Sequence, residues 1–127
     1  RTFYIGEGVT QCLTPEGFEA AMDFLSFVAG GSFLAVTYVR KDFIDSRNLY
    51  GWKNAHDKYV AGGIWLLGLD PEELRSVLNG YGWRLVGDVD YGALARRYVE
   101  PTGPRLTSTK VERVALAEKV TPPGRAQ

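Results

Sequence analysis

Residues 3–16 read FYIGEGVTQCLTPE, and this stretch decides the fold. Its first part is typical of a strand, because aromatic and β-branched residues run up to a glycine and Glu7 follows in a loop. Its last part starts a helix, since Thr14 is a good N-cap and Pro15 takes the first helical position, where no N–H is needed. A carboxylate just after such a strand lies where open α/β sheets bind ligands. The stretch therefore predicts an α/β fold with a ligand site near Glu7.

The composition is that of a globular domain. The chain has 127 residues, of which 45% are hydrophobic and 24% are charged. Fifteen basic residues balance fifteen acidic ones, which argues against a nucleic-acid or anionic-membrane partner. The apolar run at residues 33–39 is too short to span a bilayer. The single cysteine excludes an internal disulfide and indicates a reducing compartment, so we expect a cytoplasmic location. One histidine and one cysteine cannot form a zinc site of the usual kinds.

Helices and strands are expected to alternate along the rest of the chain. The first helix should run to about Ala29, with apolar residues at the spacing of one buried face. Residues 33–39 lack polar alternation, which is typical of a strand covered on both faces, and a right-handed crossover should join it to the first strand. A second helix should start at Asp70 and Pro71 and end near Gly82. The remaining prediction is a strand at 83–86, a short helix at 91–99, a loop at 101–109 and a strand at 111–119.

Residues 40–68 form a long segment of mixed polarity that is rich in aromatic residues. A segment of this length inside a compact domain is usually a functional lid or carries a helix of its own, and we expect a helix near 49–60. The tail at 120–127 is expected to be frayed.

The first strand, at residues 2–6, would be a long apolar edge of the sheet. Natural sheets avoid such an edge because its unpaired backbone groups invite another strand. We therefore expect a partner at Thr2–Gly6, either a missing N-terminal half or a second copy of the chain.

Several motifs, taken in order, resemble one family of enzymes. Residues 3–16 resemble the segment after the fourth strand in S-adenosylmethionine-dependent methyltransferases of the leucine carboxyl methyltransferase type, and the closer match is to their actinobacterial branch. LYGW at 49–52, GLDPEEL at 68–74 and YGW at 81–83 are similar to the same branch. The resemblance covers residues 2 to about 119.

The resemblance implies a Rossmann-like class I methyltransferase sheet of seven strands, in which an antiparallel seventh strand lies between the fifth and the sixth. The four strands of this chain would be numbers four to seven, with residues 40–68 as a helical lid insertion. The family's glycine-rich cofactor loop and its acidic ribose ligand belong to earlier strands and are not in this sequence. The chain is thus expected to be a single partial domain, 1–127, that forms the C-terminal half of the enzyme.

The resemblance also implies a cofactor site at Glu7, Gly6 and Gly8. In similar methyltransferases the glutamate contacts the methionine part of S-adenosylmethionine, whose ammonium group a carboxylate neutralises. The two glycines would let the backbone approach the cofactor. The residues alone are also compatible with a solvated loop carboxylate and with glycines that serve only the turn.

Candidate substrate residues lie near the same edge of the sheet. They are Thr10, Arg40, Tyr50, Trp52 and Trp65. Arg40 would suit a carboxylate substrate and the aromatic side chains an acceptor pocket. Each has a plainer alternative: Thr10 as a satisfied loop hydroxyl, Arg40 in a solvated charged turn, and the aromatic residues packing the lid onto the core.

No catalytic residue follows from the sequence. Cys12 stands where the family commonly has tyrosine, which puts any role of that tyrosine in doubt here. A catalytic cysteine is a weak hypothesis because only His56 could assist it, and a free cysteine is more often a buried small hydrophobe. Methyl transfer depends mainly on positioning, and a carboxylate acceptor needs no base.

Two functions remain as expectations. The first is a methyltransferase that methylates oxygen of a small molecule or a carboxylate. This chain would supply the methionine-side contact and the lid, but by itself it is expected to be inactive and to bind the cofactor weakly or not at all. The second is a non-enzymatic interaction module, or half-domain, that associates through its sheet edge.

Overall fold

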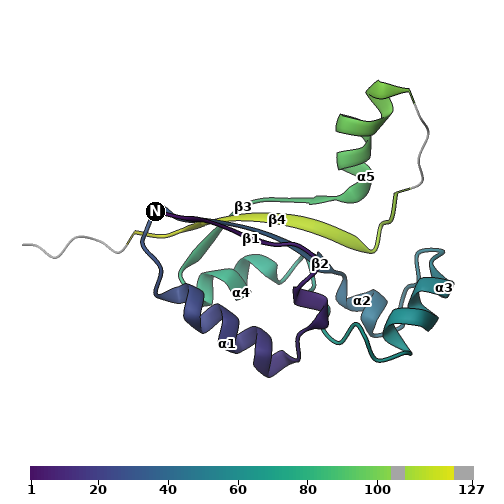
Figure 1. The fold of residues 1–127 in the computed structure, drawn as a ribbon, viewed down its shortest axis with the longest axis horizontal. Coiled ribbons are helices and arrows are strands. Elements are labelled where there is room, and N and C mark those ends of the chain that lie inside the picture. Colours follow the sequence, from purple (N-terminus) through teal and green to yellow (C-terminus); the bar gives the residue numbers. More distant parts are fainter. Residues whose placement is uncertain (104–107, 122–127) are drawn as a thin grey trace, which may run out of the picture.

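A four-stranded open sheet forms the centre of the computed structural model, which describes residues 1–103 and 108–121 (Figure 1). Its strands are β1 (Phe3–Gly6), β2 (Phe33–Val39), β3 (Trp83–Asp90) and β4 (Glu112–Lys119). They lie in the order β1-β2-β4-β3. β1 and β2 pair in parallel, whereas β4 is antiparallel to both β2 and β3. The fold is thus mixed α/β with mostly antiparallel pairings, and the prediction that the last strand is antiparallel is confirmed.

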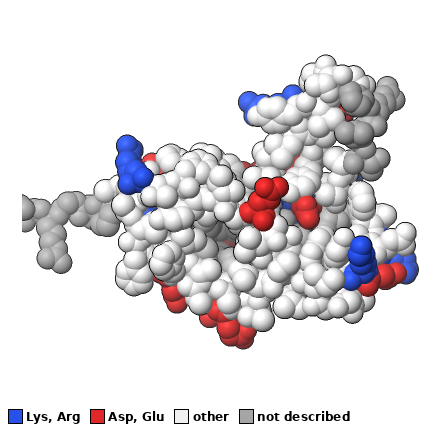
Figure 2. Space-filling model, viewed as in Figure 1, with Lys and Arg blue, Asp and Glu red and all other residues white. Residues whose placement is uncertain are grey.

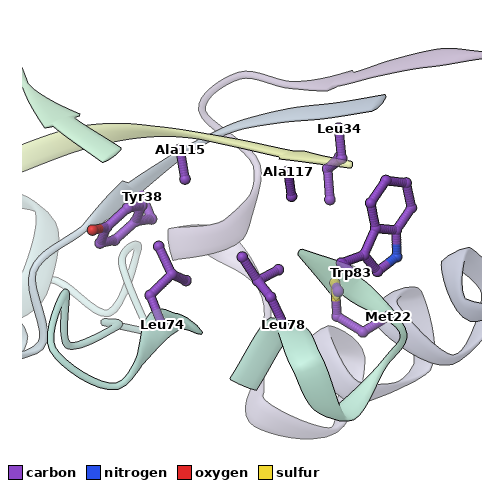
Figure 3. Packing of buried hydrophobic residues seen from close by; sticks show 8 residues of the cluster. All are labelled: Met22, Leu34, Tyr38, Leu74, Leu78, Trp83, Ala115 and Ala117. Carbon is purple, nitrogen blue, oxygen red and sulfur yellow. The ribbon is translucent and has the colours of Figure 1, made fainter. Parts of the chain in front are cut away.

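Helices cover one face of this sheet. α1 (Pro15–Ser26) and α4 (Leu74–Gly80) lie side by side on the lower face in Figure 1. Thr14 caps α1, because its Oγ1 accepts a hydrogen bond from the N–H of Gly17 at 3.0 Å. The main core lies between these helices and the sheet (Figure 3) and consists of Met22, Leu34, Tyr38, Leu74, Leu78, Trp83, Ala115 and Ala117.

The other face of the sheet is largely uncovered. Phe3 and Ile5 are 57% and 73% exposed, and Phe33, Ala35 and Thr37 are only half-buried. The prediction of a β2 strand covered on both faces is therefore wrong for the described residues. The apolar run showed that both faces of β2 avoid polar groups, but a sequence pattern cannot show which face receives a helix.

β1 is an edge strand, as the sequence predicted. It pairs with β2 from Phe3 opposite Phe33 to Gly6 opposite Val36, and no strand in the described part of the chain pairs with its other side. The rings of Phe3 and Phe33 stack with centroids 6.2 Å apart on the uncovered face.

Several element boundaries differ from the prediction. α1 ends at Ser26 rather than near Ala29. β3 continues past Val86 to Asp90, with a bulge between Leu85 and Gly87 that shifts its register. Residues 71–73 form a turn, so α4 begins at Leu74. Asp70 still opens this turn, since its Oδ1 accepts a hydrogen bond from the N–H of Glu72 at 2.9 Å. The loop and tail predictions fall partly on 104–107 and 122–127, which lie outside the described residues.

The lid carries short helices of its own. These are α2 (Lys41–Ile44), α3 (Lys53–Ala55) and a π-helical turn η2 (His56–Val60), so the helix predicted at 49–60 begins later, at Lys53. A second cluster of Val39, Phe43 and Val111 anchors the lid to the sheet. The remaining elements are a 3₁₀ turn η1 (Thr10–Cys12), α5 (Tyr91–Leu94), a π-helical turn η3 (Ala95–Val99) and a 3₁₀ turn η4 (Glu100–Thr102).

α5 and η3 stand on the opposite side of the sheet from α1 and α4 in Figure 1 and confirm the short helix predicted at 91–99. In the part of the chain that is described, no helix has the length and apolar character needed to cross a bilayer.

Candidate functional site

The candidate site lies where β1, β2 and β3 end. The chain leaves β1 at Gly6, leaves β2 at Val39 to enter the lid, and leaves β3 at Asp90 to enter α5. β4 begins at this same end, with Glu112 paired opposite Val39. Because the carboxyl ends of strands that run in one direction share one edge, the topology brings the Glu7 loop, the lid and α5 together.

Glu7 is exposed in the loop after β1. The following Gly8 has φ 69°, a left-handed conformation that a side chain would strain, and its N–H donates to Thr37 Oγ1 at 2.8 Å. A Cβ on Gly6 would meet Val36 only at an ordinary 3.6 Å. The turn therefore requires glycine at Gly8 but not at Gly6, and it holds the Glu7 carboxylate at the rim, open to a ligand.

The 3₁₀ turn η1 ties this loop to the sheet and to the lid. Thr10 is buried, and its hydroxyl donates to the Thr37 carbonyl at 2.9 Å, as a satisfied loop hydroxyl does. The Gln11 carbonyl accepts from the N–H groups of Leu66 and Leu67 at 2.6 and 3.2 Å. The side-chain Oε1 of Gln11 is buried and has no hydrogen-bond partner among the described residues.

Cys12 and His56 do not form a nucleophilic pair. Cys12 is exposed, so the expectation that it is a buried small hydrophobe is wrong: Thr10 and Gln11 take the buried positions of η1. His56 Nε2 lies 2.8 Å from Ser46 Oγ, and its ring packs edge-on against Phe43.

Arg40 and Tyr50 belong to a closed cluster rather than to an open pocket. Arg40 donates to Asp42 at 3.3 Å, and Tyr50 donates its hydroxyl to the other oxygen of Asp42. The Arg40 guanidinium also lies 5.3 Å from the centre of the Tyr50 ring. Burial would lower the pKa of Arg40, but the hydrogen bond and charge of Asp42 raise it. Arg40 therefore already has a carboxylate partner inside the chain.

Trp52 and Trp65 line a pocket with a volume of about 880 Å³. The lid contributes Trp52, Tyr59 and Trp65 to one wall, and the Tyr59 and Trp65 rings stack with centroids 4.6 Å apart. The α5–η3 segment contributes Tyr91, Leu94 and Tyr98 to the facing wall. None of these three residues was predicted from the sequence as a site residue, although their spacing marks one face of a helix.

Tyr91 and Glu112 are both in the lining and interact with each other. Burial raises the pKa of Tyr91 to about 12, with further contributions from the charges of Glu112 and Glu7 and from a hydrogen bond to Glu112. Tyr91 is therefore a neutral hydroxyl at physiological pH and lies within the electrostatic reach of both carboxylates.

The pKa of Tyr91 predicts alkaline sensitivity. The unfolded chain releases this proton near its ordinary pKa of 10.0 and the folded chain near about 12, so the unfolded state binds fewer protons in between. The contribution of Tyr91 to the free energy of unfolding is complete below the pKa of the unfolded chain. It is lost as the pH rises through the pKa of the folded chain. Urea unfolding measured across this range should show a smaller alkaline loss of stability in Tyr91→Phe than in the unchanged chain.

Tyr98→Phe is the matched control, since Tyr98 is 63% exposed on the same segment. An alkaline loss that Tyr91→Phe leaves unchanged would contradict the assignment.

The charges of the surface are scattered. On the face drawn in Figure 2, lysine and arginine side chains occur in small separate groups, and most of the surface is uncharged. No protein-family model and no curated protein matches the chain. The functional proposal accordingly depends on the residues and on their arrangement.

Proposed function

We propose that this chain forms part of an S-adenosylmethionine-dependent methyltransferase that transfers a methyl group to oxygen. The observation that carries the proposal is the strand order β1-β2-β4-β3, with the reversed β4 between β2 and β3. This is the arrangement that strands four, five, seven and six take in the class I methyltransferase fold that the sequence resembles. A reversed last strand in this internal position narrows the choice of folds far more than an α/β composition does.

Glu7 supports the proposal through its chemistry. S-adenosylmethionine carries an ammonium group and a sulfonium centre, and both are stabilised by a nearby carboxylate. The Glu7 carboxylate is exposed at the end of β1, and Gly8 lets the chain turn sharply beside it. Glu7 and Gly8 need not react themselves, because methyl transfer from a sulfonium is an in-line displacement that depends on positioning.

The proposal includes a partner at the β1 edge. β1 has a free edge in the described chain, and its Phe3 and Ile5 side chains lie exposed on the uncovered face. A half-domain with the glycine-rich cofactor loop, or a second copy of this chain, would pair with that edge and cover those side chains. The unpaired Cys12 thiol favours a reducing, cytoplasmic location.

A titration with S-adenosylmethionine, followed by amide chemical shifts, tests the proposal. Weak, millimolar binding should shift the backbone signals of Gly6, Glu7 and Gly8, and Glu7→Gln should abolish these shifts. Glu16→Gln is the matched control, because Glu16 is an exposed carboxylate in the first turn of α1. Shifts that are absent, or that survive Glu7→Gln, would refute the cofactor role; micromolar binding would refute the need for a partner half.

A second candidate function is a non-enzymatic interaction module. The exposure of Phe3 and Ile5 on an edge strand favours it, since such a strand readily pairs with another chain. Light scattering combined with size-exclusion chromatography separates the two functions. A stable dimer together with no Glu7-dependent cofactor shifts would favour the module.

A further inference from the structure

We infer that the pocket between the lid and the α5–η3 segment binds a flat, largely apolar molecule that presents a neutral hydroxyl rather than a carboxylate. The identification of this ligand as the methyl acceptor rests on the proposed function, but its chemical class does not. The volume of the pocket, about 880 Å³, lies within the range that holds a small organic ligand.

The walls of the pocket favour a planar ring system. Trp65 stacks on Tyr59 with an angle of 13° between the rings, which gives one wall a broad flat surface. Trp52 extends this wall, and Leu94 and Tyr98 face it. Aromatic walls of this kind stack on flat ligands and bury little polar surface in doing so.

The polar groups of the pocket favour a hydroxyl. Glu112 is half-buried on β4 and lies beside Tyr91 in the lining. A carboxylate accepts a hydrogen bond from a ligand hydroxyl but repels a ligand carboxylate, and this repulsion is strong where water is partly excluded. Among the described residues of the lining there is no lysine or arginine to offset it.

The position of Arg40 supports the same conclusion. Arg40 already donates its Nε–H to Asp42 and lies over the Tyr50 ring, so a carboxylate substrate would compete with Asp42 for the charge of Arg40. Asp42 pairs with the Arg40 guanidinium, whereas the Glu112 carboxylate in the lining forms no ion pair with any of the described residues. The charge arrangement thus disfavours the carboxylate acceptor that the family resemblance alone would suggest.

The transfer step balances with these groups. If a sulfonium is the methyl donor, the acceptor hydroxyl oxygen would form the new C–O bond as the C–S bond breaks, and a neutral thioether would leave. The hydroxyl proton would pass to the Glu112 carboxylate. Glu112 would thereby contact the acceptor and act as the general base that a neutral hydroxyl needs and a carboxylate does not.

Two probes with the same ring system test the inference: 2-naphthol, which is neutral at pH 7, and 2-naphthoate, which is anionic. Calorimetric titration of the full chain should show saturable binding of 2-naphthol and at least about tenfold weaker binding of 2-naphthoate. Glu112→Gln should remove most of this preference, because it keeps the shape of the side chain but not its charge. Trp65→Ala should weaken the binding of 2-naphthol by about tenfold through the loss of the stacked wall.

Two matched controls separate the pocket from the rest of the surface. Glu118→Gln changes a carboxylate on the same strand and the same face as Glu112, outside the lining, and should leave the preference intact. Phe3→Ala removes an exposed ring from the uncovered face and should leave the affinity intact.

Equal binding of the two probes, a preference that survives Glu112→Gln, or an affinity that depends on Phe3 rather than Trp65 would overturn the inference. None of these measurements requires S-adenosylmethionine. If the pocket binds the probes as stated but the cofactor titration fails, the methyltransferase proposal is wrong and the inferred ligand class stands. If the cofactor titration succeeds but the probes do not bind as stated, only the inferred ligand class is wrong.

Discussion

Replacing Trp83 by alanine should lower the free energy of unfolding by about 3–5 kcal/mol, the usual cost of deleting a large aromatic side chain from a packed core. Trp83 is 0% exposed at the start of β3 and lies in the same cluster as Met22 and Leu78 (Figure 3). Its ring therefore fills space between the sheet and both α1 and α4. A domain of ordinary stability, with a free energy of unfolding of about 5–15 kcal/mol, would lose a large part of that free energy.

Urea unfolding followed by circular dichroism measures this loss. Trp83→Phe should retain much more stability than Trp83→Ala, because the indole N–H makes no hydrogen bond to the described residues and its removal leaves no broken pair. Phe27→Ala is the surface control, since Phe27 is 89% exposed, and should change stability by no more than about 0.5 kcal/mol. A Trp83→Ala loss as small as that of Phe27→Ala would show that Trp83 does not organise the core.

Replacing Asp88 by alanine should lower the free energy of unfolding by about 3 kcal/mol. Asp88 accepts hydrogen bonds from the Tyr38 hydroxyl at 2.8 Å and from Arg113 Nε at 3.1 Å. The Asp88 and Arg113 side chains are only 13% and 18% exposed, and Tyr38 is 1% exposed. Burial and the bond to Asp88 also raise the pKa of Tyr38. The variant would leave a guanidinium without its counter-charge and a buried hydroxyl without its acceptor.

Comparison with an exposed ion pair isolates the effect of burial. Arg84 and Glu118 pair across β3 and β4 with side chains 59% and 31% exposed, so Glu118→Gln should cost no more than about 1 kcal/mol. Asp88→Asn should fall between the two, because it keeps an acceptor for Tyr38 but not the charge that faces Arg113. Equal losses for Asp88→Ala and Glu118→Gln would mean that burial adds nothing to this network.

Part of the candidate site could be predicted from the sequence. The glycine-flanked Glu7 and the lid residues Trp52 and Trp65 were recognisable, because a strand end and a dense aromatic segment are local signals. Glu112 and Tyr91 were not recognisable as site residues. Neither carries a local motif, and the pocket that they share with Trp65 joins segments far apart in the chain.

The assignment of Arg40 shows the same limit. A charged residue after a strand is compatible both with binding a ligand and with internal pairing, and the choice depends on what lies within a few ångströms. The fold brings Asp42 to its guanidinium and places the Tyr50 ring beneath it. Tyr50 lies eight residues beyond Asp42 and donates its hydroxyl to the Asp42 carboxylate. Hydrophobic periodicity in the sequence does not predict such a contact.

The sequence by itself determined the elements: the start of α1 at Thr14 and Pro15, the turn at Asp70 that leads to α4, and four strands of which the first lies at an edge. Caps, glycines and hydrophobic periods act over a few residues, so their meaning does not depend on the rest of the chain. Only the tertiary structure decided which face of the sheet α1 and α4 cover, which charges pair, and that residues of the lid and of α5 line one pocket with Glu112. These features arise from packing between distant segments, where burial and electrostatics depend on neighbours that only the folded chain brings together.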